Sequence, residues 1–245
     1  MAIYAYGVVP RAAGLPARLT GVGAGRPPIR LVEEGPIAAV VSDLDESGEL
    51  DSRDVVTHKR VVEAIFKRSP IIPFRFAMVS PDEATLRREL RRSARAHAAG
   101  LRSLRNRVEY GVTATFDEEA MLRTILSERR EIRELSAASR SGSDLPQLVG
   151  LGEAVATEVD RRRRIEGRQL VRRLKPLAVG YDERPARQDT VLRGSFLLER
   201  GHVRRFRGAV ARLNREHGGT LQLECVGPLP PYSFASSRQR PPGAG

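Results

Sequence analysis

Short strand-like segments alternate with amphipathic helical segments along most of the chain, and this alternation limits the folds open to it. The order is near β-β-β-α-β-α-β in the first half and α-α-β-β-α-β in the second half. It favours an α+β architecture of two small sheet-and-helix domains over a doubly wound sheet with a cofactor crevice. A length of 245 residues suits two such domains. We expect them at residues 1–116 and 117–234.

The expected segments follow from the periodicity of apolar residues and from turn signals. Alternating or continuous apolar runs predict strands at 2–9, 29–32, 37–42, 71–76, 108–116, 177–182, 191–199 and 220–226. Apolar residues at three- and four-residue spacing predict helices over 81–105, 117–138, 148–174 and 203–216. The same spacing from Val55 to Phe66 predicts an earlier helix, with Asp51 or Ser52 as its cap. Residues 235–245 lack any large apolar side chain, so we expect a disordered tail there.

Composition excludes several classes of protein. A single cysteine, Cys225, rules out an intramolecular disulfide framework and a multi-cysteine zinc site, and it fits a reducing, cytoplasmic compartment. The longest apolar stretches, such as Ile37 to Val41, are far shorter than the roughly 18–20 residues of a membrane-spanning helix. The amino-terminal MAIYAYGVV has no basic segment. We therefore expect neither a membrane association nor a secretory signal.

We assign no catalytic, cofactor-binding or metal-binding residue. The glycine-rich loop 21–26 lacks the third glycine of a dinucleotide fingerprint, because Arg26 stands in its place. No two of the four histidines lie at metal-ligand spacing with a second ligand nearby. His58 and His97 fall on the apolar faces of their helices, which favours packed, hydrogen-bonded imidazoles over catalytic ones. An enzyme with one of these histidines beside a carboxylate in an open pocket is an alternative interpretation.

The chain is basic, with 42 lysines and arginines against 30 acidic residues and a formal net charge of +12. Residues 87–107 carry eight arginines against Glu89 alone, and Arg161 to Arg164 form an uninterrupted basic run. These clusters support an alternative function as a basic nucleic-acid-binding regulator. However, a helix spreads Arg161 to Arg164 around most of a turn, and aromatic residues make up only 5% of the chain. A solvated helix face is therefore favoured over a nucleic-acid partner.

Several motifs, taken in order along the chain, resemble those of the gas vesicle protein GvpL/GvpF family. They are YAYGVV at 4–9, IAAVVSDL at 37–44, HKRVVEAIF at 58–66, IIPFRFAMV at 71–79, VEYGVTATF at 108–116, VLRGSFLLER at 191–200 and GPLPPYSF at 227–234. The resemblance extends from Tyr4 to Phe234. The chain departs from the family pattern at three positions, where Lys59 replaces an acidic residue, Ala77 a glycine and Leu229 a tryptophan.

The resemblance implies a minor accessory component of gas vesicles, the gas-filled protein shells that give prokaryotic cells buoyancy. It implies no enzyme activity and no cofactor. The implied fold has a ferredoxin-like amino-terminal domain and a carboxy-terminal domain with a modified sheet and added helices. The implied partner is the small, hydrophobic major shell protein, whose assembly in the cytoplasm such a component helps to nucleate from the gas-facing side of the shell. Other gas vesicle accessory proteins are further candidate partners.

The residues of these motifs are the candidate partner-binding positions, and we expect mainly structural roles for them. They are His58, Phe74, Arg75, Phe76, Glu109, Gly227, Pro228, Pro231, Tyr232 and Phe234. Strand alternation sends Arg75 to the face opposite its phenylalanine neighbours, where Glu63 or Glu109 is a candidate ion-pair partner. The prolines of 227–234 stiffen that segment toward polyproline II, with Tyr232 and Phe234 as anchors on one side. We expect the segment to dock on its own domain, and the arginine-rich helices to form the polar rim of an apolar, shell-binding surface.

Overall fold

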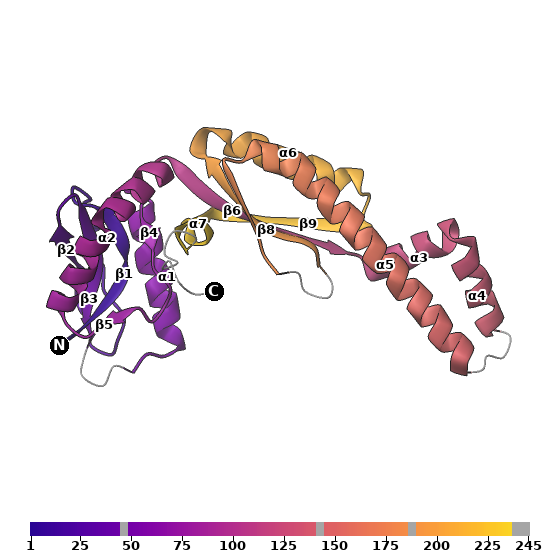
Figure 1. Ribbon diagram of the computed structural model, residues 1–245, viewed down its shortest axis with the longest axis horizontal. Coiled ribbons are helices and arrows are strands. Elements are labelled where there is room, and N and C mark those ends of the chain that lie inside the picture. The colour runs from indigo at the N-terminus through magenta and orange to yellow at the C-terminus, as the bar shows by residue number, and fades with distance from the viewer. Residues whose placement is uncertain (45–48, 141–144, 186–189, 237–245) are drawn as a thin grey trace. The chain divides into compact units, whose positions relative to one another are not determined.

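A computed structural model of the chain describes residues 1–44, 49–140, 145–185 and 190–236, which form two compact units (Figure 1). The first unit comprises Met1–Glu109 together with the segment from Gly227 onward, and the second comprises Tyr110–Val226. Each unit combines an antiparallel sheet with helices. The expected α+β class with two sheet-and-helix parts is therefore confirmed.

The first unit is built on a five-stranded sheet. Its strands are β1 (Ala2–Pro10), β2 (Arg30–Glu34), β3 (Ile37–Leu44), β4 (Ile72–Pro73) and β5 (Val79–Ser80), in the order β2-β3-β1-β4, with β5 also paired to β1. Successive residues of β1 from Ile3 to Val9 are all buried, so both faces of the sheet are covered. Helix α2 (Glu83–Leu104) packs across all five strands, and α1 (Ser52–Phe66) packs on β1.

Helices α1 and α2 each begin at an aspartate cap. Asp51 accepts hydrogen bonds from the first amides of α1, and the Asp54 carboxylate accepts the Asp51 N–H in return. Asp82 accepts the Thr85 N–H at the start of α2. The buried face of α1 is the one that its spacing predicts, except that Val55 is 47% exposed.

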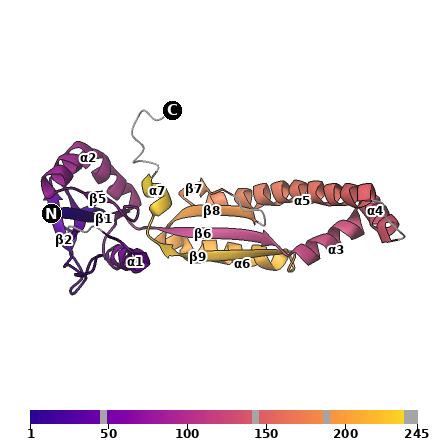
Figure 2. The ribbon, with the colours of Figure 1, turned by 90° about the horizontal axis from the view of Figure 1, so that it is seen from below.

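The second unit is built on a four-stranded sheet in the order β7-β8-β6-β9. Its strands are β6 (Arg107–Phe116), β7 (Gly180–Glu183), β8 (Thr190–Glu199) and β9 (Leu221–Leu229). Helices α5 (Leu145–Leu174) and α6 (Val203–Glu216) lie on one face of this sheet (Figure 2), with short 3-10 turns at Lys175–Leu177 and Arg200–His202. Helix α5 lies very close to the sheet, because a Cβ atom on Gly167 of α5 would lie 2.6 Å from the Val191 carbonyl oxygen of β8.

The expected single helix over 117–138 is wrong. The chain forms α3 (Glu118–Glu128) and α4 (Arg130–Arg140), because Arg129 between them has extended backbone angles of φ −103° and ψ 97°. The break lets α4 fold back, so that Ile132 joins Met121 and Ile125 in a small core against the first half of α5. Residues 141–144, between the helices expected at 117–138 and 148–174, lie outside the described residues.

The expected strand over 71–76 is also wrong. Only Ile72–Pro73 pairs as β4, and the chain then turns at Ala77, whose φ is 65°, before β5. Arg75 therefore lies outside any strand and is exposed.

The compact units differ from the expected ranges 1–116 and 117–234 at two places. Most of β6 belongs to the second unit, because β6 pairs with β8 and β9. The segment from Gly227 belongs to the first unit and contains the short helix α7 (Tyr232–Ser236). Ala235 is buried in α7 instead of opening the expected tail at 235–245, of which residues 237–245 lie outside the described part of the chain.

Candidate functional site

His58 lies at the centre of a buried hydrogen-bond network that joins α1, β1 and the turn between β4 and β5. The residue is 4% exposed. Its Nε2 lies 3.2 Å from the Phe74 carbonyl oxygen, which can only accept, so Nε2 carries the proton. Nδ1 of the neutral ring is then the acceptor of the Tyr4 hydroxyl proton, at 2.9 Å. The same hydroxyl accepts the Ala77 N–H at 3.1 Å.

Burial and aromatic packing keep this imidazole neutral. Burial lowers the pKa of His58 and raises the pKa of the Tyr4 hydroxyl. The imidazole stacks on Tyr6, with ring centroids 5.5 Å apart and an interplanar angle of 23°, and Phe76 meets it edge-on at 6.0 Å. Because both ring nitrogens are engaged, His58 has no free lone pair for a metal ion or a substrate proton. The predicted packed, hydrogen-bonded imidazole is confirmed at this position.

His97 is also a packed side chain. Its Nδ1 lies 3.1 Å from the Ser93 hydroxyl oxygen on the same helix, and burial lowers the pKa of its imidazole. Neither His97 nor His58 pairs with a carboxylate in the described part of the chain. The described residues therefore do not supply the open histidine–carboxylate pocket that the enzyme interpretation requires.

The carboxy-terminal motif 227–234 docks on the first unit. The Ser233 backbone N–H donates to a Glu109 carboxylate oxygen at 2.9 Å, and the Ser233 hydroxyl donates to the other oxygen at 2.5 Å. The Tyr232 hydroxyl lies 3.5 Å from His58 Nε2, and burial raises the pKa of Tyr232 to about 12. We expected this motif to dock on residues 117–234, but Glu109 and His58 belong to the first unit. The part of the chain that receives the motif was therefore predicted wrongly.

The local shape of this motif also differs from the expectation. Gly227 and Pro228 continue β9, and Pro231 is buried just before α7. Tyr232 and Phe234 lie in α7, not in a polyproline II segment. Residues two apart on a helix point in different directions, so Tyr232 and Phe234 are not anchors on one side.

The structure thus brings together five of the ten motif residues, namely His58, Phe74, Phe76, Glu109 and Tyr232. Arg75 stands apart, since it is exposed and forms no ion pair with any residue that the structure describes. The expected ion pairs of Arg75 are wrong: Glu63 lies 3.8 Å from Lys59, and Glu109 holds Ser233.

The glycine-rich loop closes over the sheet beside this network. The Val22 N–H donates to the Tyr6 hydroxyl at 2.8 Å, and that hydroxyl lies 2.9 Å from the Ser42 hydroxyl oxygen. A Cβ atom on Gly21 would come within 2.4 Å of the Ser42 oxygen, so only glycine fits there. The Gly23 N–H donates to Asp54 at 2.8 Å.

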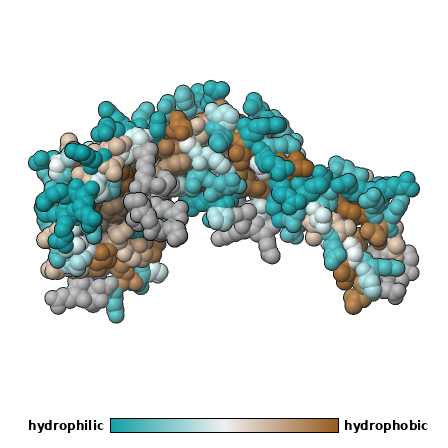
Figure 3. All heavy atoms as spheres, in the orientation of Figure 1, coloured by the Kyte–Doolittle hydropathy of each residue, from teal (hydrophilic) through white to brown (hydrophobic). Residues whose placement is uncertain are grey.

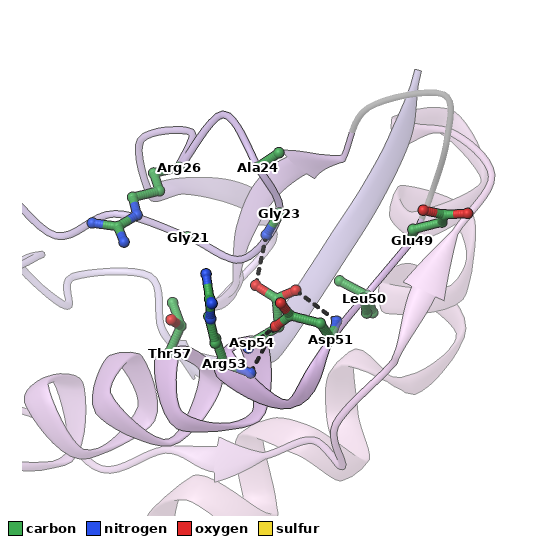
Figure 4. Close-up of a pocket in the computed structure, with 10 residues that line it drawn as sticks. All are labelled: Gly21, Gly23, Ala24, Arg26, Glu49, Leu50, Asp51, Arg53, Asp54 and Thr57. Carbon is green, nitrogen blue, oxygen red and sulfur yellow. Dashed lines mark hydrogen bonds between the residues drawn. The ribbon is translucent and has the colours of Figure 1, made fainter.

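The loop and the start of α1 border a cleft of about 570 Å³ (Figure 4). Arg26 and Arg53 line it together with Asp51 and Asp54. The dashed lines in Figure 4 show that the Gly23 amide and the first amides of α1 are already bonded to these two carboxylates. These three amides are therefore not free to bind a phosphate.

In the second unit, carboxylates neutralise much of the Arg161–Arg164 run. Glu158, whose side chain is 5% exposed, accepts from Arg161 at 2.7 Å, Arg129 at 2.6 Å and Arg162 at 2.8 Å. The hydrogen bonds from Arg161 and then Arg129 hold the pKa of Glu158 well below its usual range. This pairing weighs against the nucleic-acid interpretation, because guanidinium groups held by carboxylates are not free to bind phosphates.

Of the six arginines of α2, Arg88 donates to the Thr85 hydroxyl at 3.1 Å, and the other five fall into two sets. Arg87 and Arg91 pair with carboxylates of Glu83 and Glu34, at 2.7 Å and 2.9 Å. A second set, Arg92, Arg95 and Arg102, is exposed and unpaired within the described ranges. The cluster is therefore only partly available to a partner.

The described residues do not support metal binding, a reactive cysteine or a membrane-spanning helix. Across residues 1–44, 49–140, 145–185 and 190–236, no three His, Cys, Asp or Glu side chains are grouped to hold a metal ion. Cys225 is half-buried in β9, and burial raises the pKa of its thiol, which disfavours the reactive thiolate. Of the helices that the structure describes, none is long and apolar enough to cross a bilayer.

Sequence reasoning missed the residues that complete the network, above all Tyr4, Tyr6 and Ser233. A signal for the tyrosines was present: two hydroxyl groups at alternate positions of a buried strand need hydrogen-bond partners inside the fold. Ser233 gives no such signal, because its partner Glu109 is 124 positions away in the sequence.

Comparison with known proteins identifies the family. The family model described as gas vesicle synthesis protein GvpL/GvpF matches residues 2–236. This chain therefore belongs to the GvpL/GvpF family, and it is a gas vesicle component.

Individual relatives agree with this assignment. Gas vesicle protein F of Streptomyces sp. (strain CB03234) is 33% identical over 237 residues, which covers 96% of this chain and 99% of that protein. Gas vesicle protein F of Haloferax mediterranei is 23% identical over 237 residues, covering 95% and 92%. Crystal structures of GvpF from Anabaena sp. PCC7120 and from Microcystis aeruginosa match with TM-scores of 0.81 and 0.74, at 19% and 18% identity, over 96% of this chain and 98% of each structure. These two structures have the same fold.

Proposed function

We propose that this gas vesicle component binds the major shell protein through an exposed apolar surface and thereby helps to nucleate shell assembly, with no catalytic step. The observation that carries the proposal is the start of α5. Residues 145–152 contain no charged side chain, and Leu145, Leu148 and Val149 are 75%, 49% and 51% exposed. We call these three residues the apolar tip. In Figure 3 apolar surface gathers at this end of α5.

The apolar tip suits a partner that is itself apolar. Its three residues lie at i, i+3 and i+4, so they share one face of the helix. Exposed apolar groups that cluster in this way favour contact with other apolar surface. Covering them stabilises a complex by about 1 kcal/mol for each side chain, given their present exposure. The Arg130–Glu134 ion pair on the neighbouring helix α4 fits the polar rim of such a surface.

Retention on immobilised shell protein tests the proposal. We expect the wild-type chain to be retained at about 1 M NaCl, because salt screens ion pairs but does not weaken apolar contacts. The double variant Leu145→Ser, Leu148→Ser should bind about tenfold more weakly. The matched control Val55→Ser, Val56→Ser removes two exposed aliphatic side chains from α1 and should change the affinity less than about twofold.

Two results would contradict the proposal. Release of the wild-type chain by salt would show an ionic contact, and equal weakening by both double variants would show that the apolar tip has no special role. Nucleation is tested in cells that carry the variant gene, where the Leu145, Leu148 variant should form fewer vesicles than the control.

The gas-facing position is tested on isolated vesicles. A protein on the gas-facing side is shielded by the shell, so we expect it to resist added protease on intact vesicles and to be cut once the vesicles are collapsed. Equal digestion in both preparations would contradict this position.

A further inference from the structure

A strongly basic surface covers α6 and the second half of α5. Residues 164–174 and 203–216 contain nine arginines and two glutamates. All nine arginines are exposed, and we call eight of them the arginine face: Arg164, Arg168, Arg172, Arg173, Arg204, Arg205, Arg212 and Arg215. The two helices contact each other, and a bidentate ion pair from Arg173 to Glu216 joins them, with N–O distances of 2.5 and 3.2 Å.

Most of the arginine face is not neutralised by the protein itself. Arg164, Arg168 and Arg172 follow one another at intervals of four residues, so they form one row along α5. None of the three pairs with a carboxylate in the part of the chain that the structure describes. Arg161 and Arg162, one turn earlier, are held by the buried Glu158. The charge of the row is therefore available to a partner.

The spacing of the row fits carboxylates carried on a helix. A helix rises about 1.5 Å per residue, so side chains four residues apart repeat every 6 Å or so on both partners. The Arg173–Glu216 pair shows that this surface already holds one helix-borne carboxylate in the bidentate geometry that guanidinium groups prefer.

The arginine face suits a nucleic acid less well. The one aromatic ring of α6, Phe206, packs on Tyr110 and Phe196 of the sheet with centroids 6.4 and 5.1 Å apart, and all three are buried. No other aromatic residue occurs in α5 or α6, so no ring is offered for base stacking. The second half of α5 and α6 also lie against the sheet, so the part of these helices that carries the arginine face does not project as a helix that enters a groove must.

We propose that the arginine face binds an acidic helical segment of a partner protein, with carboxylates at i and i+4 spacing. This site is separate from the apolar tip and recognises charge, whereas the apolar tip recognises nonpolar surface. The arginine face is therefore a second contact beyond the proposed shell contact, and the two are tested independently.

The test uses a fluorescein-labelled, alanine-rich peptide with glutamates at every fourth position, and fluorescence anisotropy as the readout. The variant Arg164→Glu, Arg168→Glu, Arg172→Glu should bind the peptide at least about tenfold more weakly than the wild type at about 50 mM NaCl. The matched control Arg92→Glu, Arg95→Glu, Arg102→Glu changes the net charge equally, on exposed and unpaired arginines of α2. It should weaken binding less than about threefold, because it leaves every residue of the arginine face unchanged.

Three results would overturn the proposal. Equal weakening by the two triple variants would show only general charge attraction. Equal affinity for a peptide of the same composition with its glutamates in one block would remove the spacing argument. Tighter binding of a DNA duplex of about 20 base pairs than of the peptide at equal salt would assign the face to nucleic acid. Circular dichroism checks folding, and Arg168→Gln, Arg172→Gln replaces the triple variant in the same comparison if the triple variant is unfolded.

Discussion

Replacement of His58 by glutamine tests whether the buried imidazole makes the fold sensitive to pH. Burial lowers the pKa of His58, so the folded chain keeps the ring neutral where the unfolded chain, with a pKa near 6.5, binds a proton. In that range the unfolded state binds more protons than the folded state. The free energy of unfolding therefore falls as the pH drops below about 6.5, and it is restored above that pH.

The size of the effect has an upper bound. If the folded ring stays neutral down to pH 5.5, His58 alone lowers the free energy of unfolding by at most about 1.3 kcal/mol between pH 7 and pH 5.5. Glutamine does not titrate, yet it can accept from Tyr4 and donate to the Phe74 carbonyl group in the same way. The variant should lose about 1–2 kcal/mol at every pH, because glutamine cannot stack on Tyr6 as the imidazole does.

Urea unfolding followed by circular dichroism at several pH values between 5.5 and about 7 measures both effects. We expect the stability of His58→Gln to depend less on pH than that of the wild type, although His97, whose pKa burial also lowers, adds its own dependence to both proteins. The control Lys59→Gln changes the next residue, which is exposed, and leaves His58 in place. Equal pH dependence in all three proteins would refute the argument that burial keeps His58 neutral.

Four further substitutions test the packing, each by urea unfolding. Gly21→Ala should lower the free energy of unfolding by about 2–3 kcal/mol, because its Cβ atom meets the Ser42 oxygen at 2.4 Å. Gly167→Ala in α5 should lower the free energy of unfolding by about as much. Gly152→Ala on the same helix, where a Cβ atom would have nothing within 4 Å, should raise it by up to about 1 kcal/mol. A change of the same sign in both variants would contradict the close approach of α5 to β8. Ala77→Gly should stabilise by up to about 1 kcal/mol, because φ at this position is 65° and glycine adopts that angle freely. A destabilised Ala77→Gly variant would contradict a strained turn.

Sequence patterns predicted the long elements well, for a physical reason. The expected helix 203–216 has the bounds of α6, and the strand expected at 191–199 lies within β8, because both bury a regular apolar face that leaves a clear period. The strand at β4 was predicted too long and β5 was missed, because tertiary contacts decide both. The turn at Ala77 is fixed by the hydrogen bond from its N–H to the Tyr4 hydroxyl, 73 positions away.

The break at Arg129 was missed for the same reason. No glycine or proline marks it, and residues 117–138 read as one continuous helix. What stabilises the break is distant in sequence: the Arg129 guanidinium reaches Glu158 at 2.6 Å, and Ile132 on α4 packs near Met121 and Ile125. The local sequence pattern indicates which residues favour a helix, whereas these tertiary contacts determine where the helix is interrupted.

The residues that carry the family resemblance and the surfaces proposed for partners do not coincide. His58, Glu109 and Tyr232 are engaged within the first unit, where Glu109 holds Ser233 and His58 holds Tyr4. The apolar tip and the arginine face lie in the second unit and contain none of the motif residues named above. A change at Glu109 that lowers shell binding would thus report damage to the fold before it reports a lost contact. Only variants on exposed, unpaired side chains can separate partner binding from folding, because their removal leaves the buried network intact.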